Sequence, residues 1–343
     1  MKNTKKWLKI TIPALLLLIG LTTIIYPKIT GRPLVPIYKY HDLRGYPVWE
    51  IPFVYIFSYV TRAWGALLFA FMLGGFFSAF IPKERMMIYF SSKRLRNYFV
   101  AASLAPVFTV CSCAMIPIFG GIMTAGAGIG PALTFLLMAP AANIMAILFT
   151  GEIISWKLAV ARILFAFLGA IVIGWIVSKT RWGKAVEERF GVLAEQRSIQ
   201  IRGMEIDEKF WESLRVAWDL TKRVVPYLAL GVFLVSFIEA YLPAGVVAKW
   251  LAGVRGVIIG GILGVPTYTP TLVEVFFTKS LINLGMAPAA ALAFLLGAPM
   301  ASIPSMLGVS RIIGWKVVGS YAVLSIIVAI LSGLIYLSLG IGL

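Results

Sequence analysis

The sequence has few charged residues for its length. Asp, Glu, Lys and Arg make up 13% of its 343 residues, whereas a soluble domain carries about a quarter. Hydrophobic residues reach 60% of the chain, and the mean hydropathy is +0.92. This composition excludes an ordinary soluble domain and predicts a protein that crosses a membrane several times.

Histidine, cysteine and familiar catalytic motifs are also scarce. His41 is the single histidine and has no second His or Cys nearby, so we interpret it as a solvated loop residue. Cys111 and Cys113 are the two cysteines and lie too close together for a framework disulfide. The chain has neither a GxxxxGK segment followed by Ser or Thr nor an HExxH segment. We therefore predict no enzymatic activity, no cofactor and no resident metal.

Acidic residues are few relative to basic ones. The chain has 14 Asp and Glu against 31 Lys and Arg, a net charge of +17. The basic residues lie in short loops beside apolar runs and form no stripe interleaved with aromatic residues, which argues against a nucleic-acid partner. The expected partners are membrane lipid and a small-molecule solute. Whether the chain forms a homo-oligomer is left open.

Long apolar runs follow one another along the chain, each close to the length of about 20 residues that a helix needs to cross a bilayer. The uninterrupted runs are 10–26, 53–81, 130–150, 158–178, 224–241, 287–307 and 317–342. The first ends without the small residues of a cleavage site, so we interpret it as a retained helix and residues 1–52 as an anchor helix with its loop. The sequence thus predicts a multi-pass protein of the inner (cytoplasmic) cell membrane.

The chain repeats itself internally. Residues 126–157 and 285–316 align without a gap and are identical at 15 of 32 positions. The matches include an Ala-Pro pair, at Ala139 and Ala298, and a Trp-Lys pair, at Trp156 and Trp315. Shared leucines arise easily between apolar helices, but coincident Gly, Pro, Trp and Lys do not, so we infer an internal duplication.

Counting basic residues indicates how the two repeats are oriented. Two further apolar runs, 98–124 and 256–285, are interrupted by Pro and Gly. If both enter the membrane and return on the same side, 21 of the 31 Lys and Arg residues fall on the cytoplasmic side, where such residues concentrate. If both cross fully, the split is about even. We therefore predict an all-α integral membrane fold of two inverted repeats, with about seven crossing helices and two re-entrant helical hairpins with broken tips.

The same reasoning divides the chain into segments. Repeat A covers 53–178 and repeat B covers 226–343, with a cytoplasmic linker at 179–225 between them. The linker holds 10 basic and 8 acidic residues, which predicts one or two amphipathic helices at the membrane surface. Inverted repeats with broken helices near the midplane are typical of secondary transporters, so the predicted function is that of a membrane permease.

The interrupted run of repeat A carries the most distinctive chemistry. Pro106 and Pro117 flank Cys111-Ser112-Cys113, and each proline removes a backbone donor, so a continuous helix is not expected. In an extended or turning backbone the two thiols converge, and thiolates select soft ions and metalloids. The alternative is that both cysteines are small apolar residues that pack a tight interface.

Other polar residues within the apolar runs are candidates because burying them in lipid is costly. Asn143 and Ser302 occupy equivalent positions of the two repeats. We predict that they line the translocation path, and the alternative is hydrogen bonding between helices. Glu274 follows the Pro266–Pro270 break and is either a proton-coupling carboxylate or the ion-pair partner of Lys279, one turn away.

Three more charged residues lie near the ends of apolar runs. They are Arg62, Arg162 and Glu239. Long charged side chains at such positions reach the membrane interface, so we expect all three to extend toward the polar headgroups.

Residues 110–153, which include VCSCAMIPIF, resemble the signature of the ArsP-type predicted permeases, whose characterised members export trivalent organoarsenicals. A second signature runs from Gly264 to Pro270, and the resemblance spans roughly 53–343. It implies that Cys111 and Cys113 are metalloid ligands facing the tip of the second half. In many relatives a cysteine follows the Pro-x-Tyr of this second signature, whereas this sequence has Thr269 there, so the site has two thiols at most.

Two other functions stay open at this point. One is a permease or channel for another small solute or an anion, with half-helix N-termini as the anion site. The other is a membrane thiol oxidoreductase, which needs a reducible cysteine pair; the second half has no cysteine, and Cys111 with Cys113 alone would close a strained ring.

Overall fold

The computed structural model describes residues 2–30, 45–80, 83–108, 112–202, 204–241, 250–251, 253–266 and 273–340. Every regular element within these ranges is helical, which confirms the all-α prediction. The elements up to the first repeat's end are α1 (Lys2–Thr30), α2 (Ile51–Phe80), α3 (Lys83–Phe90), α4 (Leu95–Leu104), η2 (Ala105–Val107), α5 (Ser112–Thr124), α6 (Ile129–Ala141), α7 (Ile144–Phe149), the π-helical turn η3 (Thr150–Ile154) and α8 (Trp156–Lys179). They are followed by α9 (Arg181–Arg202), α10 (Ile206–Tyr241), α12 (Gly253–Gly264), α13 (Val273–Asn283), α14 (Pro288–Met300), α15 (Ile303–Ile313) and α16 (Trp315–Ser338).

Four helical segments are long and apolar enough to cross a membrane. They are Ile129–Ile154, Trp156–Lys179, Pro288–Ile313 and Trp315–Ser338. Shorter apolar helices occur at Lys9–Thr23, Leu67–Phe80, Ser112–Thr124 and Gly253–Gly264. The chain therefore has the helices of a multi-pass membrane protein, while the total of about seven crossings stays a prediction.

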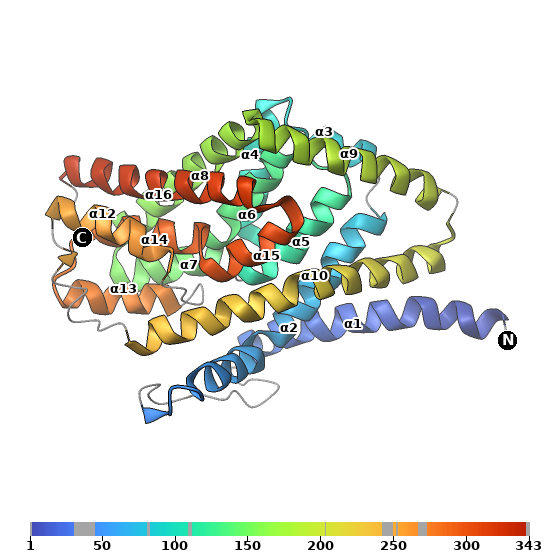
Figure 1. Cartoon of the computed structure of the whole chain (residues 1–343), viewed down its shortest axis with the longest axis horizontal. Coiled ribbons are helices and arrows are strands. Elements are labelled where there is room, and N and C mark those ends of the chain that lie inside the picture. The colour runs from blue at the N-terminus through green and yellow to red at the C-terminus, as the bar shows by residue number, and fades with distance from the viewer. Residues whose placement is uncertain are drawn as a thin grey trace.

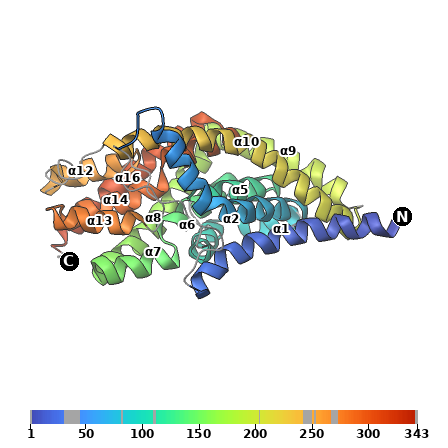
Figure 2. The ribbon, with the colours of Figure 1, turned by 90° about the horizontal axis from the view of Figure 1, so that it is seen from below.

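The helices gather in two groups that meet at α5 and α15. Figure 1 shows α12, α14 and α16 toward one end of the long axis and the start of α1 at the other, with α10 running along much of its length. Figure 2, turned by 90°, shows α1 again at the end opposite to α12 and α13. Helix α5 packs against both α2 and α6, and α15 packs against both α10 and α16. These two short helices therefore connect the groups.

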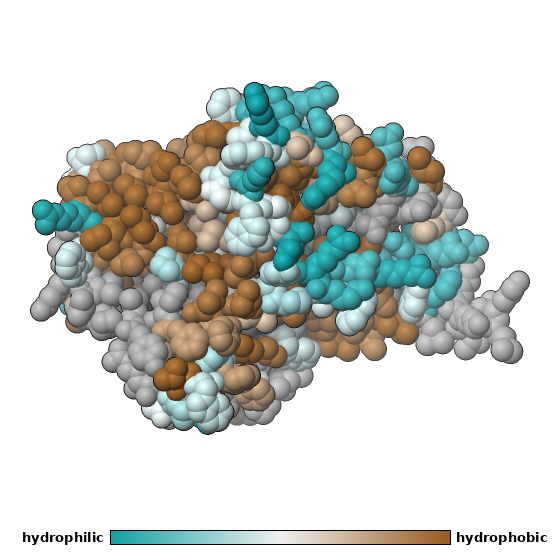
Figure 3. Space-filling model, in the orientation of Figure 1, coloured by the Kyte–Doolittle hydropathy of each residue, from teal (hydrophilic) through white to brown (hydrophobic). Residues whose placement is uncertain are grey.

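The outer face of the first group is apolar. Figure 3 shows hydrophobic residues over the region of α12 and α16. On α16 the exposed side chains recur every fourth residue, as Val323, Ile327, Leu331 and Ile335. That spacing places them on one side of the helix, and a contiguous apolar patch on an outer surface indicates contact with lipid.

The duplicated sequences fold alike. Helices α6 and α14 each have 13 residues, and α8 and α16 each have 24. The residues after α6 and α14 also match: Ala142 has φ −143° and ψ 46°, and Ala301 has φ −139° and ψ 44°. The repeats share a helix break at the same position, whereas their inversion relative to the membrane stays a prediction.

Both interrupted runs contain two helices separated by a stretch outside the described residues. The first holds α4 and α5 on either side of 109–111, and the second holds α12 and α13 on either side of 267–272. Glycines bring some of these helices very close to their neighbours. A Cβ placed on Gly121 of α5 would lie 2.1 Å from the carbonyl oxygen of Gly74 on α2, so side chains are excluded at that crossing.

The linker segment is helical, as expected. It forms α9 and the first part of α10. Glu187 of α9 accepts hydrogen bonds from the Ser92 hydroxyl, at 2.7 Å, and from the backbone N–H of Ile129 in the first turn of α6, at 3.2 Å. A carboxylate at a helix N-terminus is stabilised by the helix dipole, so this contact anchors α9 to repeat A.

The predicted topology is tested with reporter fusions. Because most basic residues fall on one side in the hairpin arrangement, reporters within 86–96 and 185–210 are expected to be cytoplasmic, and one within 244–250 external. Paired alkaline phosphatase and green fluorescent protein fusions measure both states at each site. An external reporter within 185–210 would contradict the inverted arrangement.

Candidate functional site

The helix break in repeat A is capped by Asn143. Helix α6 ends at Ala141, and Asn143 occupies the N-cap of α7 with its side-chain oxygen accepting from the Ala146 N–H at 2.8 Å. The Asn143 side chain is 1% exposed. An N-cap oxygen satisfies one of the unpaired donors at a helix start, which explains how this break persists inside the protein.

The break in repeat B is built differently around Ser302. Ser302 is the N-cap residue of α15, yet its hydroxyl hydrogen bonds with the Ser305 hydroxyl at 2.7 Å and does not cap the helix. Like Asn143, it is 1% exposed. Within the described part of the chain, neither side chain hydrogen bonds to another helix, so the interhelical alternative is not observed. Their lining of a translocation path stays a prediction.

The cysteine segment is only partly described. Cys111 and Thr269 lie outside the described residues. Ser112 and Cys113 open α5, and both are buried.

Cys113 lies in a small apolar cluster where three other helices meet. The cluster contains Ile51 of α2 and both Leu228 and Val232 of α10, and Ile303 of α15 packs against it. Ile303 directly follows Ser302, so the start of α5 and the break in repeat B belong to the same region. Among the described residues, no three His, Cys, Asp or Glu side chains gather as a metal site would require.

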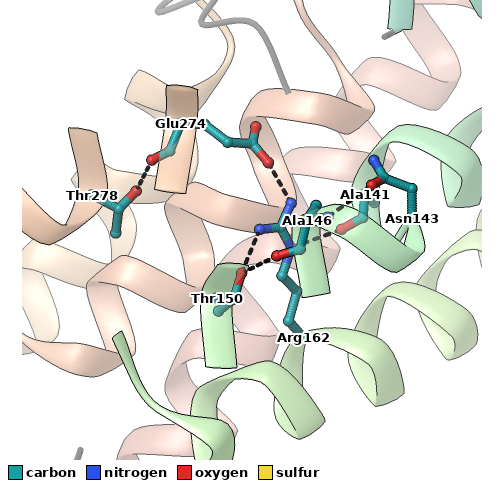
Figure 4. Close-up of polar contacts among 7 residues, drawn as sticks. All are labelled: Ala141, Asn143, Ala146, Thr150, Arg162, Glu274 and Thr278. Atoms are coloured by element: carbon teal, nitrogen blue, oxygen red, sulfur yellow. Dashed lines mark hydrogen bonds and ion pairs between the residues drawn. The ribbon is translucent and has the colours of Figure 1, made fainter. Parts of the chain in front are cut away.

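Arg162 and Glu274 form a buried ion pair between the two repeats (Figure 4). Their side chains are 0% and 1% exposed. Arg162 belongs to α8 of repeat A, and Glu274 lies in the first turn of α13, just past the Pro266–Pro270 break. The pair therefore joins the repeats near a predicted hairpin tip.

The other N–H groups of Arg162 donate hydrogen bonds to residues at the helix break of repeat A. Its Nε donates to the carbonyl oxygen of Ala141 at 2.7 Å, and Nη1 donates to the Thr150 hydroxyl at 3.0 Å. Thr150 in turn donates to the Ala146 carbonyl oxygen at 2.6 Å. Figure 4 shows these groups around one guanidinium. Ala141 is the last residue of α6, so Arg162 satisfies a carbonyl that the break leaves without a helical partner.

Two sequence-based interpretations are corrected here. Arg162 was expected to extend to the membrane interface, but it is fully buried because its guanidinium is paired and hydrogen bonded inside the protein. Glu274 is in an ion pair, but its partner is Arg162 and not Lys279. The side chains of Arg62 and Glu239 lie outside what the structure describes.

A signal for Arg162 is present in the sequence. In the gapless alignment of the two repeats, continued past residue 157, Tyr321 corresponds to Arg162 and Val309 corresponds to Thr150. The π-helical turn η3 also occurs at Thr150 and has no counterpart in the continuous helix α15. Such turns often mark functional sites. An arginine that one repeat has and the other lacks therefore indicates a candidate site residue.

The comparisons with known proteins find relatives that cover most of the chain. A family model described as "Predicted permease", of the ArsP type, matches residues 52–337. The UPF0718 protein MJ0584 of Methanocaldococcus jannaschii is 30% identical over 329 residues, covering 79% of this chain and 90% of that protein. The UPF0718 protein YraQ of Escherichia coli K12 is 24% identical over 263 residues, covering 76% and 73% respectively. No solved structure matches the chain.

Proposed function

Because the chain belongs to the ArsP-type family of predicted permeases, we propose that it exports a soft metalloid compound, such as a trivalent organoarsenical, across the cytoplasmic membrane. In this proposal the inverted repeats form one path, and Cys111 and Cys113 hold the metalloid. Asn143, Ser302, Ser112 and Thr269 supply the polar lining.

The surroundings of Cys113 carry this proposal. The thiol sits at the start of a half-helix, and its neighbours are aliphatic side chains of α2 and α10. A soft trivalent centre prefers sulfur ligands over oxygen, and an organic substituent on it favours an apolar environment. Two thiols suit a monosubstituted arsenic(III) species, which has two positions for sulfur.

We further propose that Glu274 couples transport to proton movement. A buried carboxylate near a break is a common feature of proton-coupled transporters. Protonation of Glu274 neutralises its charge and weakens its hold on Arg162, which also binds the end of α6. The state of the carboxylate is thereby linked to the helix break of repeat A.

The thiols provide the decisive test. Cells that lack their own arsenical efflux are given the wild-type chain or the Cys111→Ser/Cys113→Ser variant, and their growth is followed in trivalent organoarsenicals. Because serine oxygen is similar in size to sulfur but is a poor ligand for a soft centre, the variant is expected to keep its membrane level and to lose protection.

The Cys111→Ala/Cys113→Ala variant is the matched control. It is expected to behave like the serine variant, since the loss is one of ligation and not of hydrogen bonding. Wild-type resistance in the double serine variant would overturn the metalloid assignment. Transport of another solute by that variant would leave the chain a permease of a different class.

A further inference from the structure

A groove of about 520 Å³ lies between α9 and α10. The C-terminal ends of α5 and α15 close it, with Thr124 and Ile312 among its lining residues. Figure 3 shows hydrophilic side chains gathered over this region, in contrast to the apolar surface over α12 and α16. The groove is separate from the helix breaks and from the ion pair between the repeats.

Three arginines from three helices line the groove. They are Arg189 of α9, Arg223 of α10 and Arg311 of α15. Two acidic residues, Glu212 and Asp219, also line it. Each of these is paired along its own helix: Arg215 lies 3.8 Å from Glu212, and Lys222 lies 3.0 Å from Asp219. The excess charge facing the groove is therefore positive.

The arginines keep hydrogen-bond donors available. Arg189 donates to the Ile312 carbonyl oxygen at the end of α15. The guanidinium of Arg311 stacks on Tyr227, 3.7 Å from the ring centroid. Arg223 has no ion pair within the described part of the chain. A guanidinium has five N–H donors, so the single bond of Arg189 and the stacking of Arg311 leave donors for a planar or tetrahedral anion.

The groove also has apolar walls. Its walls include Phe190 and Leu193 of α9 and Leu220 of α10. On the same two helices, Trp182 and Trp218 are exposed. Exposed Trp side chains are typical of the headgroup level of a bilayer. A groove with basic donors and apolar walls at that level matches a molecule with an anionic head and a hydrocarbon body.

We propose that this groove binds the headgroup of an anionic phospholipid, with the phosphate held by Arg189, Arg223 and Arg311 and the first carbons of the lipid against Phe190 and Leu220. Basic pockets between helices bind acidic lipid headgroups in this way. The bound lipid bridges α9, α10 and α15 and fixes the linker helices to repeat B. The site is independent of the solute that the permease carries.

The test uses the purified full-length protein in detergent. Phosphatidylglycerol or phosphatidylcholine is titrated in, and bound lipid is counted by native mass spectrometry alongside the thermal unfolding midpoint. Phosphatidylglycerol is expected to bind and raise the midpoint of the wild type more than phosphatidylcholine. A basic residue near a membrane surface contributes about fivefold in affinity, so Arg223→Gln is expected to weaken binding about fivefold and Arg223→Gln/Arg311→Gln more than tenfold.

Arg255→Gln, on α12 and outside the groove, removes the same charge and is expected to retain wild-type lipid binding. If the double variant does not fold, Arg223→Gln alone gives the comparison, because Arg223 makes no ion pair in the described structure. Equal responses to the two lipids, or equal binding by Arg223→Gln and Arg255→Gln, would overturn the proposal. A midpoint shift of the same size from inorganic phosphate alone would instead assign the groove to a free anion.

Discussion

Arg162→Met is expected to remove most of the protein from the membrane. The substitution leaves the Glu274 carboxylate buried without its counter-charge. It also removes the N–H groups that donate to the Ala141 carbonyl oxygen and the Thr150 hydroxyl. Breaking a buried ion pair costs about 3–5 kcal/mol, which is a large part of a total stability of about 5–15 kcal/mol. The amount of full-length protein in membranes and its thermal midpoint in detergent measure the loss.

The double variant Arg162→Met/Glu274→Met separates pairing from packing. Replacing both members of a buried pair by apolar residues is often neutral, so the double variant is expected to recover much of the lost stability. Lys279→Met removes a charge one turn from Glu274 and is expected to change little. Equal losses in the single and double variants would show that the two side chains are not energetically coupled.

The same double variant also tests the coupling proposal for Glu274. If Glu274 carries a proton during transport, the folded double variant inserts normally and does not transport. A double variant that transports at the wild-type rate would leave the pair a purely structural contact.

Asn143→Leu is expected to abolish transport while leaving most of the protein in the membrane. Leucine has a similar shape but offers no polar group to a solute, and it removes the hydrogen bond to the Ala146 N–H. Loss of an N-cap costs about 0.5–2 kcal/mol, which reduces stability without preventing folding. Solute flux in reconstituted vesicles, divided by the amount of protein inserted, gives the result.

Asn143→Ser is the matched control, because it keeps a capping oxygen and copies the residue of the second repeat. It is expected to restore the membrane level and to transport less than the wild type. An Asn143→Leu variant that disappears from the membrane would identify Asn143 as a packing residue. Full transport by that variant would exclude it from the path.

The helix breaks after α6 and α14 correct the prediction that 130–150 and 287–307 are uninterrupted runs, although the prolines beside these breaks are visible in the sequence. Proline and glycine coincide in the two repeats, and both repeats end their first helix at the same Ala-Pro segment, after Pro140 and Pro299. Asn143 and Ser302, which follow these prolines, were identified because they are polar residues at equivalent positions of two apolar runs. Their partners within three residues also follow from helix geometry.

The pairing of Arg162 with Glu274 was not predictable in this way. The two residues are 112 positions apart in the sequence, and they come together because α8 and α13 both pack against η3. From local sequence, Lys279 is the nearest partner for Glu274, and Arg162 lies near the end of an apolar run. Local rules therefore placed Arg162 at the membrane interface instead of the interior and named the wrong ion-pair partner for Glu274.

The ion pair also makes the two repeats unequal. Two identical repeats related by a twofold axis would place every cross-repeat contact twice. Here Tyr321 corresponds to Arg162 when the gapless alignment of the repeats is continued. Ala114 corresponds to Glu274 when Pro106 is aligned with Pro266. The contact exists once, so it distinguishes the two repeats. Exchanging either half for a copy of the other would leave Arg162 or Glu274 buried without its partner, so the two halves are not interchangeable.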